Sequence, residues 1–521
     1  MIPPEKTGED GLNKKITVKN KKILSFPDGL EFIQRRTENL CFCASRAILI
    51  FSGGSYNNDN VEAERKNFRP VRKNRRNHMR KKGIAAVVLA GVMAAGVLAG
   101  CGNSKSTSVT SGSQTAGSNS DVVVINYPTF QCGTNTAAPV CDELIKEFNE
   151  QYKGKYEIKK EDVPGDQNYI DKIKVQLGTG DLPPVIYGAG YNLLDLVLQK
   201  DLAVDLTDAV NSDPEWKAMY NDTAMTVNSR NGKIYASSSE GNTIGYFYNK
   251  DLFKKAGISE PAKTWDEFFE QLDKLKNAGI TPMSMDTADS AWVTQLWMGA
   301  MVGTASADGL KLMQTMNPTD YNTPEMINAA SNIQKIFENY TTADAVGGKY
   351  ENAANNFLSG QTAMIANGPW MIGDFSDTSK TTTDFADKVG VALFPGNFVY
   401  NAPIQGYIVT KQDDPKVEEA AIEMVKFFTS KHAQQTALEM QGMVPATDQV
   451  QVTDKAKENF PLLGEFLDMV PTAGASSDTM QSTMYPNLLD VLSQQLPLLA
   501  SGELDAKGFC QALTDAAAKN Q

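Results

Sequence analysis

The alternation of short β-branched segments with amphipathic helical segments, from residue 122 onward, constrains the fold of this chain more than any other feature. Residues 122–125 form an apolar β-branched run, and residues 157–163 and 184–187 are weaker segments of the same kind. Between the first two segments, apolar side chains recur with helical period at Val140, Leu144, Ile145, Phe148 and Tyr152. This order predicts parallel strands joined by crossover helices, and therefore an α/β fold.

Two later stretches carry the helical period most clearly. Residues 264–267 read Thr-Trp-Asp-Glu, a capping box that predicts the start of one helix, and residues 417–428 predict another. Their apolar positions are Trp265, Phe268, Phe269, Leu272 and Leu275 in the first helix, and Val417, Ala420, Ala421, Met424, Val425 and Phe428 in the second. The pattern contains no tandem repeat. About 400 residues are more than one hydrophobic core usually accommodates, so we expect an α/β body of two lobes.

Charge is distributed unevenly along the chain. Residues 1–100 carry 19 Lys and Arg against 9 Asp and Glu, whereas residues 101–521 carry 31 basic and 53 acidic side chains. Such an acidic body repels nucleic acid and anionic lipid, so we expect no nucleic-acid partner. The only histidines are His78 and His432, which argues against histidine-based zinc sites and a Ser-His-Asp triad. We expect neither a metal nor a cofactor.

A secretory signal precedes the acidic body. Residues 79–82 read Met-Arg-Lys-Lys, eighteen uncharged residues follow over 83–100, and Cys101 comes next. The end of this segment, Leu-Ala-Gly-Cys, resembles the lipobox of bacterial lipoproteins, in which the cysteine is lipidated. We therefore predict a lipoprotein signal peptide over residues 79–100 and lipidation of Cys101. A transmembrane helix is the alternative, although eighteen residues lie at the lower limit of spanning length.

The segments on either side of this signal have simpler interpretations. Residues 1–78 are basic and lack periodicity, and we interpret them as the product of a misassigned start upstream of Met79; the alternative is a cytosolic extension. Residues 101–120 are rich in Ser, Gly and Thr and predict a flexible tether. Cys132 and Cys141 are close enough in sequence for a local disulfide, which their spacing alone does not decide.

Several blocks of the body resemble one protein family. Residues 248–258, Tyr-Asn-Lys-Asp-Leu-Phe-Lys-Lys-Ala-Gly-Ile, followed by 263–268, Lys-Thr-Trp-Asp-Glu-Phe, resemble the family 1 extracellular solute-binding proteins. These are the carbohydrate receptors of ABC importers and are similar to maltodextrin-binding protein. Further matching blocks are 177–183, 364–370, 394–395, 406–409, 420–430 and 441–445, so the resemblance covers roughly residues 121–515. The chain departs from the family pattern at Pro184, usually Asp, and at Ala236, often Pro.

The resemblance implies a two-lobe periplasmic-binding-protein-like fold of type II, with lobes joined by hinge strands and the ligand held between them. Chain crossings are then expected at 235–236 and 405–406. The corresponding lobes are residues 121–236 with 406–442, and residues 237–405 with 443–521.

The resemblance and the expected positions of the strand ends together give the candidate ligand-binding residues. Trp370 matches a tryptophan that stacks on sugar in the family, and Glu240 matches a hinge-proximal glutamate that accepts hydrogen bonds from hydroxyl groups. Phe130 follows the first strand, at the end where ligands of parallel sheets bind, although core packing is its alternative. Trp265 is expected to be structural. The remaining candidates are Tyr191, Asn192, Asp286, Asp289, Trp292, Gln405 and Tyr407.

The expected function is capture without chemistry. The chain contains no Gly-x-x-x-x-Gly-Lys-Ser/Thr phosphate loop, so the transporter's own ATPase subunits would supply energy. We predict a monomeric extracytoplasmic receptor, anchored to the bacterial cell membrane by lipid, that delivers a mono- or oligosaccharide to an ABC permease. Arg230 is the only arginine after residue 101, which favours a neutral ligand. Two alternatives stay open: a non-sugar solute such as a peptide, polyamine or metal complex, and a secreted glycosidase with two catalytic carboxylates.

Overall fold

The first predicted strands and helix are present in the computed structural model, which describes residues 122–520. Strand β1 (Val123–Thr129), helix α2 (Ala138–Gln151), strand β2 (Tyr156–Asp162) and strand β3 (Val185–Tyr187) follow the predicted order. Strands β1 and β2 pair in parallel. The first strand continues beyond its predicted end at residue 125, because Ile125 and Tyr127 both point into the core and prolong the alternation.

The predictions made for residues 1–78, 79–100 and 101–120, including Cys101, lie outside the described residues. Within the described part of the chain, no helix combines the length and the apolar character needed to cross a membrane.

The main strands of the first lobe form the parallel pair β1–β2 and a separate three-stranded antiparallel sheet. Strand β12 (Tyr407–Val409) lies between β3 and β6 (Ala236–Ser237) and is antiparallel to both, so the expectation of a purely parallel sheet is corrected. The predicted helix at 417–428 is confirmed as α15 (Pro415–Phe428), which packs on this sheet and buries Ala420, Ala421, Met424, Val425 and Phe428. The other elements of this lobe are α3 (Asp166–Thr179), α4 (Leu193–Gln199), α5 (Thr207–Ser212), α6 (Pro214–Lys217), α7 (Asp222–Asn228), β4 (Ser229–Arg230), β5 (Lys233–Ile234) and α16 (Lys431–Gln441).

The second lobe is built around strand β7 (Gly241–Asn249). Its sheet has the order β13 (Ala475–Ser477), β11 (Phe398–Pro403), β7, β9 (Thr362–Asn367) and β8 (Thr281–Met283), and β10 (Val389–Ala392) also pairs with β7. The helices of this lobe are α8 (Lys250–Lys255), α9 (Trp265–Asn277), α10 (Trp292–Ala305), α11 (Ala307–Gln314), α12 (Pro324–Asn339), η3 (Ala343–Ala345), α13 (Tyr350–Leu358), η4 (Pro369–Ser376), α14 (Phe385–Lys388), α17 (Asp454–Asn459), α18 (Pro461–Met469), η5 (Val470–Thr472), α19 (Met480–Thr483), α20 (Asn487–Ser501), α21 (Ala506–Ala517) and η6 (Ala518–Asn520).

The predicted capping box at the start of α9 is confirmed. The backbone N–H of Glu267 donates to Thr264 Oγ1 at 3.2 Å, and the Glu267 carboxylate accepts from the Thr264 N–H. These bonds satisfy backbone groups that a helix start leaves without partners. The buried positions of α9 are Phe268, Leu272 and Leu275.

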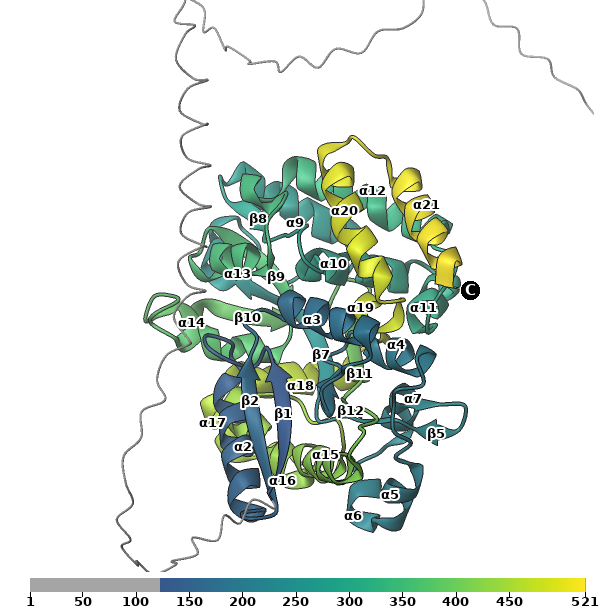
Figure 1. The fold of residues 1–521 in the computed structure, drawn as a ribbon. Coiled ribbons are helices and arrows are strands. Elements are labelled where there is room, and N and C mark those ends of the chain that lie inside the picture. The colour runs from purple at the N-terminus through teal and green to yellow at the C-terminus, as the bar shows by residue number, and fades with distance from the viewer. Residues whose placement is uncertain (1–121, 521) are drawn as a thin grey trace, which may run out of the picture. The chain divides into compact units, whose positions relative to one another are not determined.

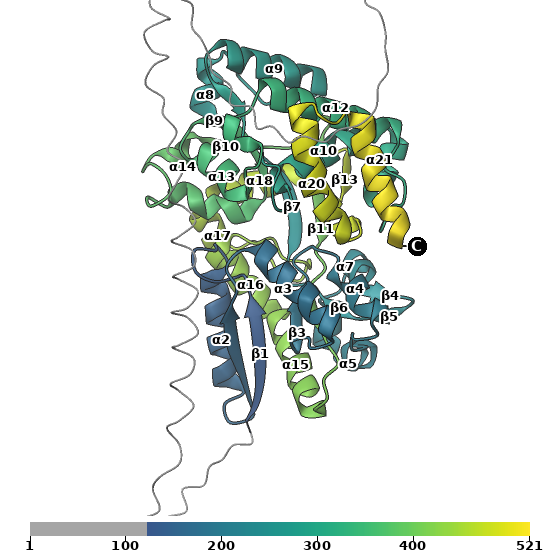
Figure 2. The same cartoon turned by 45° about the horizontal axis from the view of Figure 1, so that its top comes forward.

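In Figures 1 and 2 most elements of the second lobe lie above those of the first, with α3 at the boundary, and helix α17 contacts α16 of the first lobe. Three chain segments cross from one lobe to the other: residues 238–240 between β6 and β7, residues 404–406 between β11 and β12, and residues 442–446 after α16. They lie side by side, because the Ile404 N–H donates to the Glu240 carbonyl at 3.1 Å and the Gly241 N–H donates to the Val444 carbonyl at 2.9 Å. These crossings form the floor between the two lobes.

A glycine at one crossing is required by a close approach of two backbones. A β-carbon at Gly406 would lie 1.7 Å from the carbonyl oxygen of Ser237, a contact that no folded chain accommodates without a backbone shift. The requirement for glycine is steric and not conformational, since its φ angle is not in the left-handed region.

Candidate ligand-binding cleft

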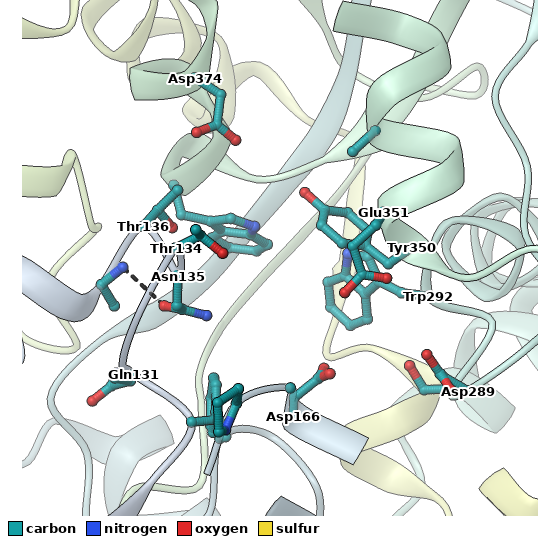
Figure 3. Close-up of a pocket in the computed structure, with 18 of the residues that line it drawn as sticks. Gln131, Thr134, Asn135, Thr136, Asp166, Asp289, Trp292, Tyr350, Glu351 and Asp374 are labelled. Carbon is teal, nitrogen blue, oxygen red and sulfur yellow. Dashed lines mark hydrogen bonds between the residues drawn. The ribbon is translucent and has the colours of Figure 1, made fainter. Parts of the chain in front are cut away.

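A cavity of about 470 Å³ is lined by residues of both lobes and by Glu240, Ile404 and Met443 of the crossing segments. Figure 3 shows part of this lining. The first lobe contributes residues from the ends of β1, β2 and β3, and the second lobe contributes residues from the starts of α10, α13 and η4. Seven of the ten predicted ligand-binding residues line it: Phe130, Tyr191, Glu240, Asp286, Asp289, Trp292 and Trp370. Cavities of this size accommodate small organic ligands.

Two tryptophans form the aromatic wall on the side of the second lobe. The rings of Trp292 and Trp370 have centroids 6.1 Å apart and planes inclined by 47°. Trp292 Nε1 donates to Asn367 Oδ1 at 3.3 Å, and Asn367 Nδ2 donates to the Tyr350 hydroxyl at 2.9 Å, so one buried amide orients two aromatic side chains. Both tryptophans are half-buried, which leaves ring surface open to the cavity.

The position of Trp370 depends on the residue two places before it. A β-carbon at Gly368 would lie 2.2 Å from Cζ3 of the Trp370 ring. The indole therefore folds back over a backbone that only glycine leaves uncovered. This explains the sequence Asn-Gly-Pro-Trp at this wall.

A second aromatic wall comes from the first lobe. Phe130 lies 6.0 Å from Tyr187, with ring planes inclined by 18°, and 5.6 Å from Tyr169. Phe130 thus packs against both hydrophobic core clusters and also lines the cavity. Sequence reasoning presented these two roles as alternatives, and the structure combines them.

Glu240 lies at the floor of the cavity, in the first crossing segment, where it accepts a hydrogen bond from the Tyr187 hydroxyl. Burial raises the pKa of Glu240 from 4.5 to about 7, against the lowering effect of the Tyr187 hydrogen bond. Near neutral pH this carboxyl is therefore both a donor and an acceptor of hydrogen bonds.

A pH dependence of stability follows from this pKa. Between pH 4.5 and about 7 the folded chain holds a proton on Glu240 that the unfolded chain has released, so the free energy of unfolding falls as pH rises through this window. Burial raises the pKa of Asp286 to about 7 and that of Asp478 to about 6, with the same sign. We expect Glu240→Gln to flatten the fall in thermal midpoint between pH 5 and pH 7 without abolishing it. Identical pH profiles for both proteins would contradict this origin.

Asp286 lines the cavity but is engaged by the backbone. Its carboxylate accepts from the N–H groups of Val293 at 3.3 Å and Thr294 at 3.1 Å, at the first turn of α10. The helix needs this acceptor because its N-cap residue, Ala291, has no side chain that can cap. Asp286 has no exposed surface, and its prediction as a ligand-binding residue gains no support from this geometry.

Three predicted residues do not line the cavity. Tyr407 lies one layer below it, stacked on Tyr187 with centroids 4.7 Å apart. Gln405 caps α4 from the second crossing, since its Oε1 accepts from the Leu194 N–H at 2.9 Å. Asn192 is fully buried and bonds across the lobes. Sequence position brought these residues close to the cleft, but their side chains point elsewhere.

Asn192 belongs to a polar network that joins the lobes beside the cavity. Its Nδ2 donates to Asn317 Oδ1 at 2.9 Å, and Asn317 Nδ2 donates to Asp195 Oδ2 at 2.8 Å. Arg230 Nε in turn donates to Asp195 Oδ1 at 2.7 Å. We call Asn192, Asp195, Arg230 and Asn317 the interlobe network. Arg230, the only arginine after residue 101, thus pairs with a carboxylate of this network.

Sequence reasoning missed several residues of the cavity wall. They have in common a polar or aromatic side chain, and most lie on loops or near the ends of helices and strands: Gln131, Asn135, Asp166, Tyr187, Asn242, Tyr350, Glu351, Asp374, Lys380, Gln441 and Gln481. Tyr187 was the one with a usable signal, because it ends the third strand at the same sheet edge as Phe130.

The cysteines and acidic side chains of the described residues form no metal-binding group of three or more. Cys132, Cys141 and Cys510 are buried free thiols, so the disulfide left open by the sequence is not formed here.

Comparison with known proteins gives a consistent family match. The protein-family model described as "Bacterial extracellular solute-binding protein" matches residues 143–461, more than half of the chain. The sn-glycerol-3-phosphate-binding periplasmic protein UgpB of Rhizobium meliloti (strain 1021) is 25% identical over 284 residues, which cover 50% of this chain and 62% of that protein. The chain thus spans less than two thirds of this curated relative.

Solved structures share the fold. A chitin oligosaccharide binding protein aligns with a TM-score of 0.68 at 22% identity, over 77% of this chain and 99% of that one. A Streptococcus pneumoniae solute-binding protein in complex with the blood group A-trisaccharide aligns with a TM-score of 0.65 at 21% identity, over 75% and 99%. At these identities the likeness concerns the two-lobe architecture.

Proposed function

The chain belongs to the family of bacterial extracellular solute-binding proteins, and from that premise we propose that it is the saccharide receptor of an ABC importer. The observation that carries this proposal is the cavity between the lobes, where the half-buried rings of Trp292 and Trp370 lie opposite polar loop residues. Aromatic faces suit the apolar side of a pyranose ring, and amide and carboxyl groups suit its hydroxyls. One structural neighbour is a chitin oligosaccharide binding protein and the other was solved in complex with the blood group A-trisaccharide, which agrees with this choice.

A phosphorylated ligand, as named for the curated relative, has less support in this cavity. Lys380 is the only basic residue that lines it within the described chain, and its Nζ lies 2.7 Å from Asp374 Oδ1. Anion sites in proteins draw on arginine, lysine or free backbone N–H groups. We therefore place the ligand among saccharides and not among glycerol phosphates.

The proposed ligand contacts are Phe130, Tyr191, Glu240, Asp289, Trp292 and Trp370, with Asn192, Asp286, Gln405 and Tyr407 assigned to the supporting structure. The proposed mechanism is capture by closure: the ligand binds between the lobes, and its better fit to the closed form shifts the population toward it. The proposed lobes are residues 121–236 with 406–442 and residues 237–405 with 443–521. The separate sheets of β6 and β7, and of β11 and β12, support these boundaries.

The purified full chain, titrated with mono- and oligosaccharides while tryptophan fluorescence and thermal midpoint are recorded, tests this function. We expect a saturable response to one class of sugar and no product by chromatography. A response to glycerol 3-phosphate alone would indicate that the chain binds the ligand named for its curated relative. A response only to a peptide, polyamine or metal complex would indicate a receptor for a non-sugar solute. Consumption of the sugar would indicate a glycosidase.

We further propose that Cys101 carries a lipid anchor and that the receptor acts as a monomer in front of a membrane permease. The support for the anchor is the Leu-Ala-Gly-Cys sequence after an apolar segment. Cys101→Ser is expected to release the protein from the membrane fraction and to abolish incorporation of labelled palmitate. Membrane retention of this variant would contradict the anchor, and sedimentation of the released protein measures its mass.

A further inference from the structure

The charge of the cavity wall narrows the ligand class further. Six carboxyl side chains line the cavity, against the single amine of Lys380: Asp166, Glu240, Asp286, Asp289, Glu351 and Asp374. Glu240 and Asp286 are half-protonated near neutral pH, because burial raises the pKa of each to about 7. The formal negative charge of the wall therefore resides mainly on the other four.

Two of these four carboxylates have a cationic partner. Lys380 neutralises Asp374, and Lys349 Nζ lies 3.3 Å from Asp289 Oδ1. Asp166 and Glu351 take part in no ion pair within the described residues. The Asp166 carboxylate accepts from the Tyr191 hydroxyl at 2.6 Å and from the Gln167 N–H at 3.0 Å, and both of these donors are neutral.

Asp166 and Glu351 come from opposite lobes. Asp166 begins α3 in the first lobe, and Glu351 lies in the first turn of α13 in the second lobe. Figure 3 shows them on the same side of the cavity, with Asp289 nearby. Burial raises the pKa of the nearby Tyr350 hydroxyl, the charges of Asp374, Glu351 and Asp166 raise it further, and the hydrogen bond from Asn367 lowers it.

Like charges carried by two lobes oppose the closure of an empty cleft. The Coulomb repulsion grows as water leaves the space between them, because the effective dielectric constant falls. A neutral sugar leaves this repulsion in place, whereas a cation between the two carboxylates turns it into attraction. Closure would then be coupled to the charge of the ligand.

One neutral side chain that lines the cavity, Gln481, also has a hydrogen-bond donor without a protein partner within residues 122–520. Gln481 is 4% exposed and lines the cavity; its Oε1 accepts from Gln295 Nε2 at 3.3 Å, while its own Nε2 donates to no group among the described residues. Such a buried donor fits a sugar hydroxyl or carbonyl. The aromatic rings, this amide and the carboxylates together describe a ring-shaped, hydroxylated and positively charged solute.

We propose that the preferred ligand is a cationic saccharide, an amino sugar or amino-sugar oligomer whose protonated amine binds between Asp166 and Glu351. This inference rests on the proposed saccharide receptor function and specifies its substrate class. It replaces the neutral ligand that the scarcity of arginine favoured.

Matched pairs of sugars test the inference. The β-1,4-linked trisaccharide of glucosamine and its fully N-acetylated form share ring number and linkage and differ in charge, and the monomeric glucosamine, galactosamine and mannosamine have N-acetylated counterparts too. We titrate the full chain with each pair at pH 6, where the amines are protonated, in 20 and 500 mM NaCl. The amine form of the recognised sugar is expected to bind about tenfold more tightly at low salt, an advantage that high salt reduces.

Glu351→Gln is expected to reduce the affinity ratio between the amine and N-acetyl forms. Glu338→Gln is the matched control, because Glu338 is an exposed residue of the neighbouring helix α12 that does not line the cavity, and it should leave the ratio unchanged. Equal or tighter binding of a neutral sugar overturns the inference and leaves the receptor function standing. Absence of binding by every sugar, charged or neutral, removes both. If both variants reduced the affinity ratio between the amine and N-acetyl forms equally, the preference for the amine would come from the overall negative charge of the protein. That result would overturn the proposed site between Asp166 and Glu351.

Discussion

Replacing Trp370 with alanine is expected to weaken saccharide binding about thirtyfold, a loss of about 2 kcal/mol that is typical of a central aromatic contact. The ring is held over Gly368 and against Trp292, so it already has the position that a stacked sugar requires. Truncation would remove the stacking surface and let water into the cavity. Isothermal titration with the recognised sugar measures the effect.

The matched control is Trp265→Ala. This tryptophan begins α9, donates from Nε1 to Thr304 Oγ1 at 2.8 Å and does not line the cavity. We expect the control variant to lower the thermal midpoint and keep the affinity, and Trp370→Ala to do the opposite. Unchanged affinity of Trp370→Ala in a folded protein would remove this residue from the ligand site.

Gly406→Ala is expected to destabilise the protein by about 3 kcal/mol, at the upper end of the cost of overpacking. The added methyl group would lie 1.7 Å from the Ser237 carbonyl oxygen and 2.3 Å from its carbon, and backbone atoms cannot turn away as a side chain does. The crossing segments would have to separate. Chemical denaturation of both proteins measures the loss.

Gly373→Ala is the control for that change. The nearest atom to a β-carbon at Gly373 is Cε1 of Phe460 at 3.8 Å, an ordinary contact, so little change in stability is expected. If Gly406→Ala were as stable as this control, the close approach of the crossings would not exist in solution.

The elements predicted from the sequence are those whose signals are local. The residues of the α9 capping box lie within one turn of the chain, those of the α15 apolar stripe lie within a few turns, and both helices are present. The antiparallel insertion of β12 between β3 and β6 was not predictable in this way. These strands come from distant parts of the chain, and no local pattern specifies how they pair.

The site was predictable where a residue follows the end of a strand or lies in a sequence block that matches the family, because both signals place residues at the cleft. That reasoning reached Trp370, Trp292 and Phe130, which line the cavity. It failed for Gln405 and Asn192, where the backbone lies near the cleft but the side chain serves another element. It also missed Glu351, because an exposed glutamate in a helix start has the same local pattern whether it faces solvent or a cavity.

The interlobe network has a consequence for how such a receptor changes over generations. Asn192, Asp195, Arg230 and Asn317 hold the lobes together through bonds that involve no residue of the ligand cavity. A ligand's apparent affinity scales with the fraction of molecules already in the competent arrangement, so substitutions here would rescale affinity for all ligands alike. Selection could then adjust how strongly the receptor holds its ligand, and how readily it gives the ligand up, while the choice of ligand stays constant. Strength and choice would be inherited as separate traits.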